Sequence, residues 1–192
     1  MSVEIRTLRG AEIAPHLEAL ATLRIAVFRD WPYLYDGDMD YERDYLRAYQ
    51  AEGALVVGAF DGDRMVGAAT AAPMEDHAQD FASAFAGQEP SDIYYLAESV
   101  LLPDWRGQGL GHRFFDARED AGRALGRARA CFCSVIRPDD HPARPAAPRT
   151  YDHFWRGRGY APLPGVTATF QWRDVGTAEE TAKRLQFWSK AL

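Results

Sequence analysis

The sequence predicts a mixed α/β fold with a central, largely antiparallel sheet and flanking helices. Two strand-like runs, 54–60 and 65–72, are joined by Asp61-Gly62-Asp63-Arg64, and an Asp-Gly pair between such runs favours a β-hairpin. A later strand, 94–102, is followed by an amphipathic helix and by the apolar run 130–136, a pattern typical of two parallel strands joined by a crossover helix. The hairpin and the parallel pair together predict a mixed sheet.

The composition fits one soluble domain that spans residues 1–192. Hydrophobic residues make up 47% and charged residues 26% of the chain, which are ordinary globular values. The net charge of −6 argues against a nucleic-acid partner, which normally requires a basic face, and fits a cationic small substrate better. No window approaches the roughly 20 apolar residues that span a bilayer, so we expect no membrane partner. Cys131 and Cys133 lie two residues apart in an apolar run, a spacing that does not suit an ordinary disulfide, so we expect both to be core thiols in a reducing compartment. This expectation predicts a cytoplasmic protein.

The N-terminal half is expected to place an acidic loop between two helices. The patterns predict a strand at 3–8, a helix with apolar residues from Ile13 to Val27, an acidic and aromatic loop at 33–40, a helix carrying Tyr41, Tyr45 and Tyr49, the two hairpin strands, and a short helix around Phe81 and Phe85. The aromatic residues of the loop are expected to be exposed.

The C-terminal half is expected to end in a helix. The patterns predict a helix with Leu110, Phe114, Ala117, Ala121 and Leu125 on one face, a proline-rich loop at 138–148, a short helix at 150–157 and a last strand at 166–175. Thr177 and Glu180 have the spacing of a capping box. This spacing predicts a C-terminal helix over about 178–191, which would dock Leu185, Phe187 and Trp188 on the body of the domain.

The segment Arg106-Gly107-Gln108-Gly109-Leu110-Gly111 lies between a strand and a helix. A phosphate-binding P-loop requires Lys-Ser or Lys-Thr after its last glycine, whereas Gly111 precedes His112-Arg113, and a dinucleotide fingerprint would require glycine or alanine at position 112. What remains is Arg-x-x-Gly-x-Gly, in which glycines allow close backbone approach and the helix N-terminal amides suit an anionic group. Taken by itself, the segment is equally compatible with a plain glycine turn.

The order of these motifs resembles the GNAT family of N-acetyltransferases. The resemblance rests on Glu98-Ser-Val-Leu-Leu-Pro-Asp-Trp-Arg-Gly-Gln-Gly-Leu-Gly111, on the helix and buried strand that follow, and on Phe154-Trp-Arg-Gly-Arg-Gly159-Tyr160. It extends in element order from Val3 to Val175. The acidic loop, the proline-rich insertion and the C-terminal segment lie outside the shared pattern.

The resemblance implies acetyl-CoA as co-substrate, held in a cleft where two parallel strands splay apart, here the strand ending at Leu102 and the strand 130–136. The backbone of Val100, Leu101 and Leu102 would pair with the pantetheine arm, and an amide near Leu101 would serve as an oxyanion donor. The pyrophosphate would be held by the amides of Arg106, Gly107, Gln108, Gly109, Leu110 and Gly111. No metal is implied, and the histidines lack metal-ligand spacing with either cysteine.

Glu98 is the candidate general base. Transfer to an amine requires a neutral nucleophile, so a base must take a proton from the ammonium, directly or through a water molecule. Glu98 lies in an otherwise apolar strand, and it resembles a position that supplies the base in several GNAT enzymes. The alternative is a structural glutamate that pairs with an arginine.

Protonation of the leaving thiolate is where the sequence departs from the family pattern. The usual tyrosine corresponds to Trp155, whose indole donates a hydrogen bond but is not a practical proton donor. Tyr151 lies four residues earlier on the same helix face and is the candidate substitute, with packing under the helix as the alternative. A coenzyme A thiol with a pKa near that of cysteine, about 8.5, can also leave as the thiolate.

The acceptor site is expected at the acidic loop, because the resemblance implies that this segment falls where GNAT proteins form the wall of that site. Tyr33, Tyr35 and Asp36 are the candidate substrate-binding residues. The aspartates at 36, 38 and 40 either attract an amine or belong to a solvated loop with an N-cap for the next helix. Four basic residues of the insertion are open to two roles, contact with a substrate carboxylate or with the cofactor's 3'-phosphate: Arg137, His141, Arg144 and Arg149.

The predicted function is N-acetyltransfer from acetyl-CoA to a primary amine of a small molecule, by direct attack in a ternary complex. One alternative is a non-catalytic acyl-CoA-binding or regulatory domain, which Trp155 favours. Another is a protein acetyltransferase that modifies lysine or an N-terminus. The acceptor, the length of the acyl group and the oligomeric state stay open, although GNAT proteins often form homodimers.

Overall fold

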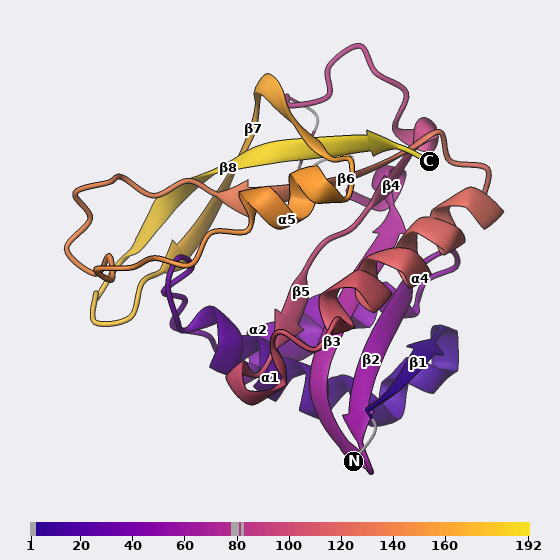
Figure 1. Ribbon diagram of the computed structural model, residues 1–192, viewed down its shortest axis with the longest axis horizontal. Coiled ribbons are helices and arrows are strands. Elements are labelled where there is room, and N and C mark those ends of the chain that lie inside the picture. The colour runs from indigo at the N-terminus through magenta and orange to yellow at the C-terminus, as the bar shows by residue number, and fades with distance from the viewer. Residues whose placement is uncertain (1–2, 78–80, 82) are drawn as a thin grey trace.

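The computed structural model describes residues 3–77, 81 and 83–192 and contains one mixed sheet with helices on both faces (Figure 1). The strand order is β1-β2-β3-β4-β6-β8-β7, and β5 also pairs with β3. Within the described residues, β4 and β6 are parallel and the other strand pairs are antiparallel. The expected fold class is therefore confirmed.

The elements largely follow the expected order. The strands are β1 (Glu4–Leu8), β2 (Leu55–Asp61), β3 (Arg64–Pro73), β4 (Ile93–Tyr95), β5 (Ser99–Leu101), β6 (Arg129–Val135), β7 (Ala161–Arg173) and β8 (Glu180–Ala191). The α-helices are α1 (Leu17–Phe28), α2 (Met39–Arg47), α4 (Leu110–Ala124) and α5 (Asp152–Gly157). The 3-10 helices are η1 (Gly10–His16), η2 (Ala48–Gln50), η3 (Met74–His77), η4 (Pro90–Asp92) and η5 (Pro103–Trp105). In the described part of the chain, no helix is long and apolar enough to cross a membrane.

The β2–β3 hairpin divides the core into two layers. Asp61 lies opposite Arg64 across a turn in which Gly62 has φ +60°, a left-handed conformation that glycine adopts without strain. Because strand side chains alternate between faces, Val57 packs in the cluster that contains Phe114 of α4, whereas Val56 packs with residues of α1 and α2. The helix expected around Phe81 and Phe85 falls partly on residues 78–80 and 82, outside the described residues.

The predicted strand 94–102 is divided by a β-bulge. Tyr95 lies opposite Ala72 and Ser99 lies opposite Ala69, so the strand that contains β4 and β5 has one more residue than β3 in this interval. The parallel pairing of β4 with β6 ends where the Leu96 amide donates to the Cys131 carbonyl at 2.8 Å. Beyond this point β5 stays on β3, and β6 continues along β8. The two strands therefore splay apart after Leu96.

The prediction of a C-terminal helix over 178–191 was wrong. Residues Glu180–Ala191 form β8, which lies between β6 and β7 and pairs antiparallel with both (Figure 1). Leu185 and Phe187 pack on one face of this strand and Trp188 packs on the other. The Thr177 hydroxyl donates to the Asp174 carbonyl in the turn before β8 instead of capping a helix. β8 completes the hydrogen bonding of the second edge of β6, and this long-range pairing outweighs the local capping pattern.

Candidate active site

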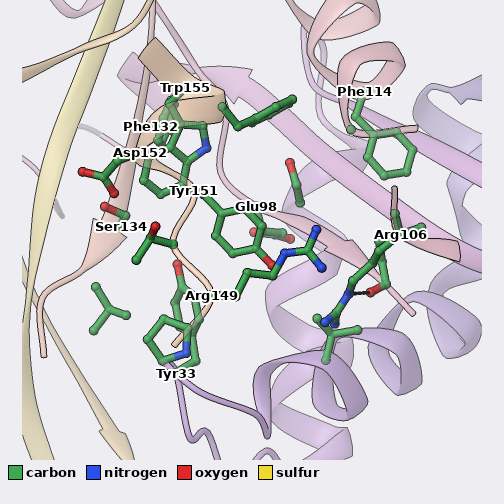
Figure 2. Close-up of a pocket in the computed structure, with 18 of the residues that line it drawn as sticks. Tyr33, Glu98, Arg106, Phe114, Phe132, Ser134, Arg149, Tyr151, Asp152 and Trp155 are labelled. Carbon is green, nitrogen blue, oxygen red and sulfur yellow. Dashed lines mark hydrogen bonds between the residues drawn. The ribbon is translucent and has the colours of Figure 1, made fainter. Parts of the chain in front are cut away.

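Two cavities meet at Glu98. The large cavity, about 860 Å³, lies between β5 and β6 and is bordered by the glycine loop and by the segment that leads into α5 (Figure 2). The small cavity, about 380 Å³, is lined by residues of α1, the loop before α2, β7 and β8. Residues that line both cavities are Phe28, Tyr33, Ala97, Glu98 and Cys133. Glu98 is thus accessible from both sides of the splay.

The glycine loop presents free backbone amides to the large cavity. Gly107 and Gly109 have φ +79° and +78°, in the left-handed region, and Gly109 is the N-cap of α4 without a side-chain cap. Within the described residues, none of the backbone amides from Gly107 to Gly111 donates a hydrogen bond. Amides at a helix N-terminus carry a partial positive charge, so the chemistry of this loop suits an anionic group.

Most of the residues predicted to bind a cofactor border the large cavity. Those in its wall are Leu101, Arg106, Gly107, Gly109, Leu110 and Gly111. Val100 is fully buried toward α1, Leu102 packs in the core, and the Gln108 side chain donates to the Asp104 carbonyl. These last three side chains lie outside the cavity wall.

The backbone of β5 faces the splay at alternate residues. The Leu102 amide donates to the Val66 carbonyl at 3.0 Å, and the Glu98 carbonyl accepts from the Thr70 amide at 3.1 Å. Because antiparallel pairing alternates along a strand, the backbone groups of Ser99 and Leu101 point away from β3. The Leu101 carbonyl accepts from Arg106 Nε at 3.0 Å, whereas its amide faces the large cavity.

Arg118 of α4 holds the bulge in place. Its side chain is 1% exposed, and Nη1 donates to the carbonyls of Thr70 and Glu98 at 3.2 and 3.0 Å, while Nη2 donates to Ser99 Oγ at 2.7 Å. Burial lowers the pKa of Arg118 to about 10. This residue was not among those that the sequence patterns predicted to be functional. The available signal was an arginine four residues after Phe114, on the apolar face of its helix.

Glu98 belongs to a buried ionic network. Its Oε1 lies 2.5 Å from Arg24 Nη1, and its Oε2 accepts from the Tyr45 hydroxyl at 3.2 Å. Arg24 Nε also donates to Glu42 Oε2 at 2.5 Å, so two carboxylates share one guanidinium. Burial alone would lower the pKa of Arg24, but Glu98 and the other neighbouring groups outweigh burial and raise it well above its usual value. The pairing with an arginine, weighed above as the alternative for Glu98, is present.

The acidic loop lines the small cavity, and its aromatic residues are half-buried rather than exposed, which differs from the expectation. Tyr33, Tyr35 and Asp36 are all in the wall. Asp36 accepts from Arg29 at 3.1 Å and from Arg173 Nε at 3.0 Å. The expectation of an N-cap aspartate is confirmed at Asp38, which accepts from the amides of Asp40 and Tyr41 at the start of α2.

The basic residues of the insertion have different surroundings. Arg137 is fixed by Asp174 at 2.8 Å and by the carbonyls of Pro32 and Tyr33, and Arg144 pairs with Asp139 at 2.6 Å. Arg149 has no ion pair within the described residues, and its guanidinium carbon lies 5.4 Å from the ring centroid of Tyr151. Figure 2 shows Arg149 and Tyr151 both pointing into the large cavity.

The cysteines are buried thiols, as expected. Cys131 and Cys133 are free, and burial raises the pKa of the Cys133 thiol to about 12. The Cys133 Sγ lies 3.5 Å from the Tyr95 hydroxyl. Among the residues that the structure describes, no group of three histidine, cysteine or acidic side chains is arranged to hold a metal ion.

A sequence model of the acetyltransferase (GNAT) family matches residues 20–150. The chain belongs to this family. Solved structures share the fold of this GNAT protein at low identity. Ribosomal-protein-alanine N-acetyltransferase from Brucella melitensis has 17% identity and a TM-score of 0.63, with coverage of 98% of this chain and 99% of that one. YncA from Salmonella typhimurium, solved with its cofactor acetyl-CoA, has 17% identity and a TM-score of 0.62, with coverage of 100% and 95%.

A third similar structure is PaiA N-acetyltransferase from Thermoplasma acidophilum in complex with coenzyme A, at 13% identity and a TM-score of 0.56, with each chain fully covered. No curated protein sequence matches this GNAT protein.

In this GNAT protein, Trp155 of α5 packs against the hydrophobic core, and Tyr151 is the N-cap residue of that helix. The Trp155 ring lies 5.0 Å from that of Phe132 and 5.1 Å from that of Trp188, whereas Tyr151 is 36% exposed and 5.9 Å from Trp155. Both residues line the large cavity. Tyr151 is therefore part of the cavity wall rather than of the packing beneath the helix.

Proposed function

We propose that this protein transfers the acetyl group of acetyl-CoA to the primary amine of a small molecule. The observation that carries the proposal is the meeting of two cavities at Glu98, one with the glycine loop in its wall and the other with the acidic loop. A thioester and an amine that enter from opposite sides reach each other at this junction. Direct transfer in a ternary complex requires this kind of approach.

The large cavity suits acetyl-CoA by its chemistry. The amides from Gly107 to Gly111 bind the pyrophosphate, and Arg106 and Arg149 supply counter-charges. We assign Arg149 to a cofactor phosphate because Arg137 and Arg144 are already ion-paired. The backbone of Ser99 and Leu101 pairs with the pantetheine arm in the place that β6 leaves open. The structures of YncA with acetyl-CoA and of PaiA with coenzyme A support this choice of cofactor.

At the junction, Glu98 takes a proton from the incoming ammonium, and the Leu101 amide donates to the thioester carbonyl oxygen. The amine nitrogen bonds to the acetyl carbon, the carbon–sulfur bond breaks, and its electron pair leaves on sulfur. The nitrogen then gives up its second proton to water, which leaves a neutral amide. The thiolate takes a proton from Tyr151 or from water, since a thiol pKa of about 8.5 makes it a competent leaving group. Arg24 supplies the counter-charge that a buried Glu98 carboxylate requires.

The size of the small cavity supports a small acceptor rather than a protein. Its volume of about 380 Å³ lies at the lower end of the range for small-molecule sites, about 300–1,000 Å³. A lysine side chain on a protein substrate would require an open groove for the peptide on either side of it. The alternative function is that of a non-catalytic acyl-CoA-binding domain. The only observation that favours it is Trp155 in place of the usual tyrosine.

Thiol release from acetyl-CoA in the presence of a panel of primary amines tests this proposal. We expect amine-dependent release of free coenzyme A and a mass increase of the amine by one acetyl group. Calorimetry with acetyl-CoA separates the alternatives, because tight binding without turnover on any amine supports the non-catalytic domain. Absence of acetyl-CoA binding contradicts both readings.

A further inference from the structure

Aromatic rings are the largest group of side chains in the wall of the small cavity. They come from elements far apart in the sequence and include Phe28, Tyr33, Tyr45, Tyr95, Phe170 and Trp172. Aromatic side chains offer a large apolar surface, and rings pack on one another in tilted or edge-to-face arrangements. The part of an amine acceptor that enters this cavity would contact these rings.

The polar atoms of these rings already have partners inside the protein. The Tyr45 hydroxyl donates to Glu98, the Tyr95 hydroxyl meets Cys133 Sγ, and Trp172 Nε1 donates to the Tyr33 carbonyl at 3.0 Å. What the wall offers an acceptor is therefore chiefly ring surface rather than hydrogen-bonding groups.

The ring faces already carry the protein's own cations. The Arg24 guanidinium carbon lies 5.2 Å from the Phe28 centroid and 4.6 Å from that of Tyr45. Arg137 and Lys183 lie 5.8 and 5.2 Å from the centroid of Trp172. These cations occupy the ring faces on which a second ammonium of a diamine or polyamine would otherwise stack.

A carboxylate on the acceptor would also lack a partner. Arg24 is held by Glu98 and Glu42, and Arg173 is held by Asp36 at 2.9 Å. The other charged groups in the wall, Asp38 and Glu180, are acidic. Since the lining carries an excess of carboxylates, one ammonium is attracted and an amino-acid carboxylate is repelled.

We propose that the acceptor is an arylalkylamine, with a single primary amine on a short chain joined to a neutral aromatic ring. This inference rests on the proposed function. The amine lies at Glu98, and the ring packs between Phe170 and the tyrosines of the wall. A compact ring with a chain of two or three carbons fits a cavity of about 380 Å³.

The test compares three classes of acceptor. Phenethylamine, tyramine and tryptamine represent arylalkylamines, 1,4-diaminobutane represents diamines, and alanine and phenylalanine represent amino acids. We expect kcat/KM for the best arylalkylamine to exceed that of the other two classes by roughly tenfold or more, the effect of burying one ring. Equal or better turnover of the diamine or of an amino acid overturns the inference.

A substitution in the wall makes the test specific. Phe170→Glu places a carboxylate beside the ring site, so it should lower kcat/KM for arylalkylamines by about tenfold or more and raise the relative preference for 1,4-diaminobutane. Leu125→Glu is the matched control, because Leu125 is 44% exposed and lines neither cavity. Equal arylalkylamine efficiency in Phe170→Glu and the wild type contradicts the placement of the ring.

Binding measurements separate this inference from the proposed function. If no amine is acetylated, calorimetry of the coenzyme A-loaded protein with phenethylamine decides the matter. Binding that Phe170→Glu weakens and Leu125→Glu preserves supports the ring site while the acetyltransferase proposal fails. Absence of phenethylamine binding overturns the inference itself.

Discussion

The Glu98 carboxylate lies 2.5 Å from the Arg24 guanidinium, at the point where the two cavities meet. The same guanidinium binds Glu42, which is fully buried and lines neither cavity. The two carboxylates therefore share a partner but differ in their access to a substrate. Substitutions of Glu98 and Glu42 can therefore distinguish a catalytic effect from a structural one.

Glu98→Gln is expected to lower kcat by about 10²- to 10⁴-fold, the usual contribution of a general base. The amide keeps the size of the side chain but cannot take the ammonium proton. Acetyl-CoA affinity, measured by calorimetry, should be unchanged because Glu98 contacts no phosphate in the proposed site. Glu42→Gln is the control and should retain most of the activity. An equal loss in both variants would mean that Glu98 acts through the ionic network alone.

Gly111→Glu is expected to abolish acetyl-CoA binding. A Cβ at this position meets only the Phe154 ring, at 3.4 Å, so the fold tolerates a side chain there. The added carboxylate would occupy the amides of the loop and repel the pyrophosphate. Gly157→Glu, at an exposed position with open space around it, should bind acetyl-CoA normally. Wild-type affinity in Gly111→Glu would refute the assignment of the loop.

Arg149→Met is expected to weaken coenzyme A binding by roughly 10- to 100-fold, the effect of one charge-assisted hydrogen bond. The affinity for acetylated pantetheine, which lacks the nucleotide phosphates, should stay the same. Arg144→Met, in the same insertion but ion-paired with Asp139, serves as the comparison. If Arg149→Met binds coenzyme A as the wild type does, the residue has no role at a phosphate.

The stability of the protein should fall as pH rises from about 9 to about 12, in part because of Cys133. Burial raises the pKa of this thiol to about 12, so it stays protonated in the folded state while the unfolded chain ionises above pH 8.5, approximately. The unfolded state is thereby favoured, at up to about 1.4 kcal/mol per pH unit. Urea unfolding should show a smaller loss between pH 8 and pH 10.5 in Cys133→Ala. Parallel losses in the two proteins would exclude this contribution.

Local patterns predicted the elements that close within a few residues. The Asp61-Gly62 turn forms the expected hairpin, and the glycine loop leads from a strand into α4 as expected, with Gly109 as the N-cap. Such features depend on backbone freedom and on neighbouring side chains. Both can be recognised in a short stretch of sequence. Asp38 likewise caps α2, as the aspartates before that helix suggested.

Long-range pairing decided what local patterns left open. Thr177 and Glu180 suggested a helix start, yet β8 forms because the free edge of β6 takes it up as a strand. Arg118 appeared as an ordinary position of an amphipathic helix until the bulge supplied the carbonyls that it binds.

The sequence alone determined the mixed fold and the glycine loop, because both depend on residue types at short spacing. Glu98, expected within a strand, lies in the bulge between β4 and β5. Only the tertiary structure decided that Glu98 meets Arg24, that the C-terminal segment is a strand, and that an aromatic cavity lies beyond the splay. These contacts join residues from distant elements. Their free energies come from burial and charge pairing, which arise only once the sheet and helices have packed.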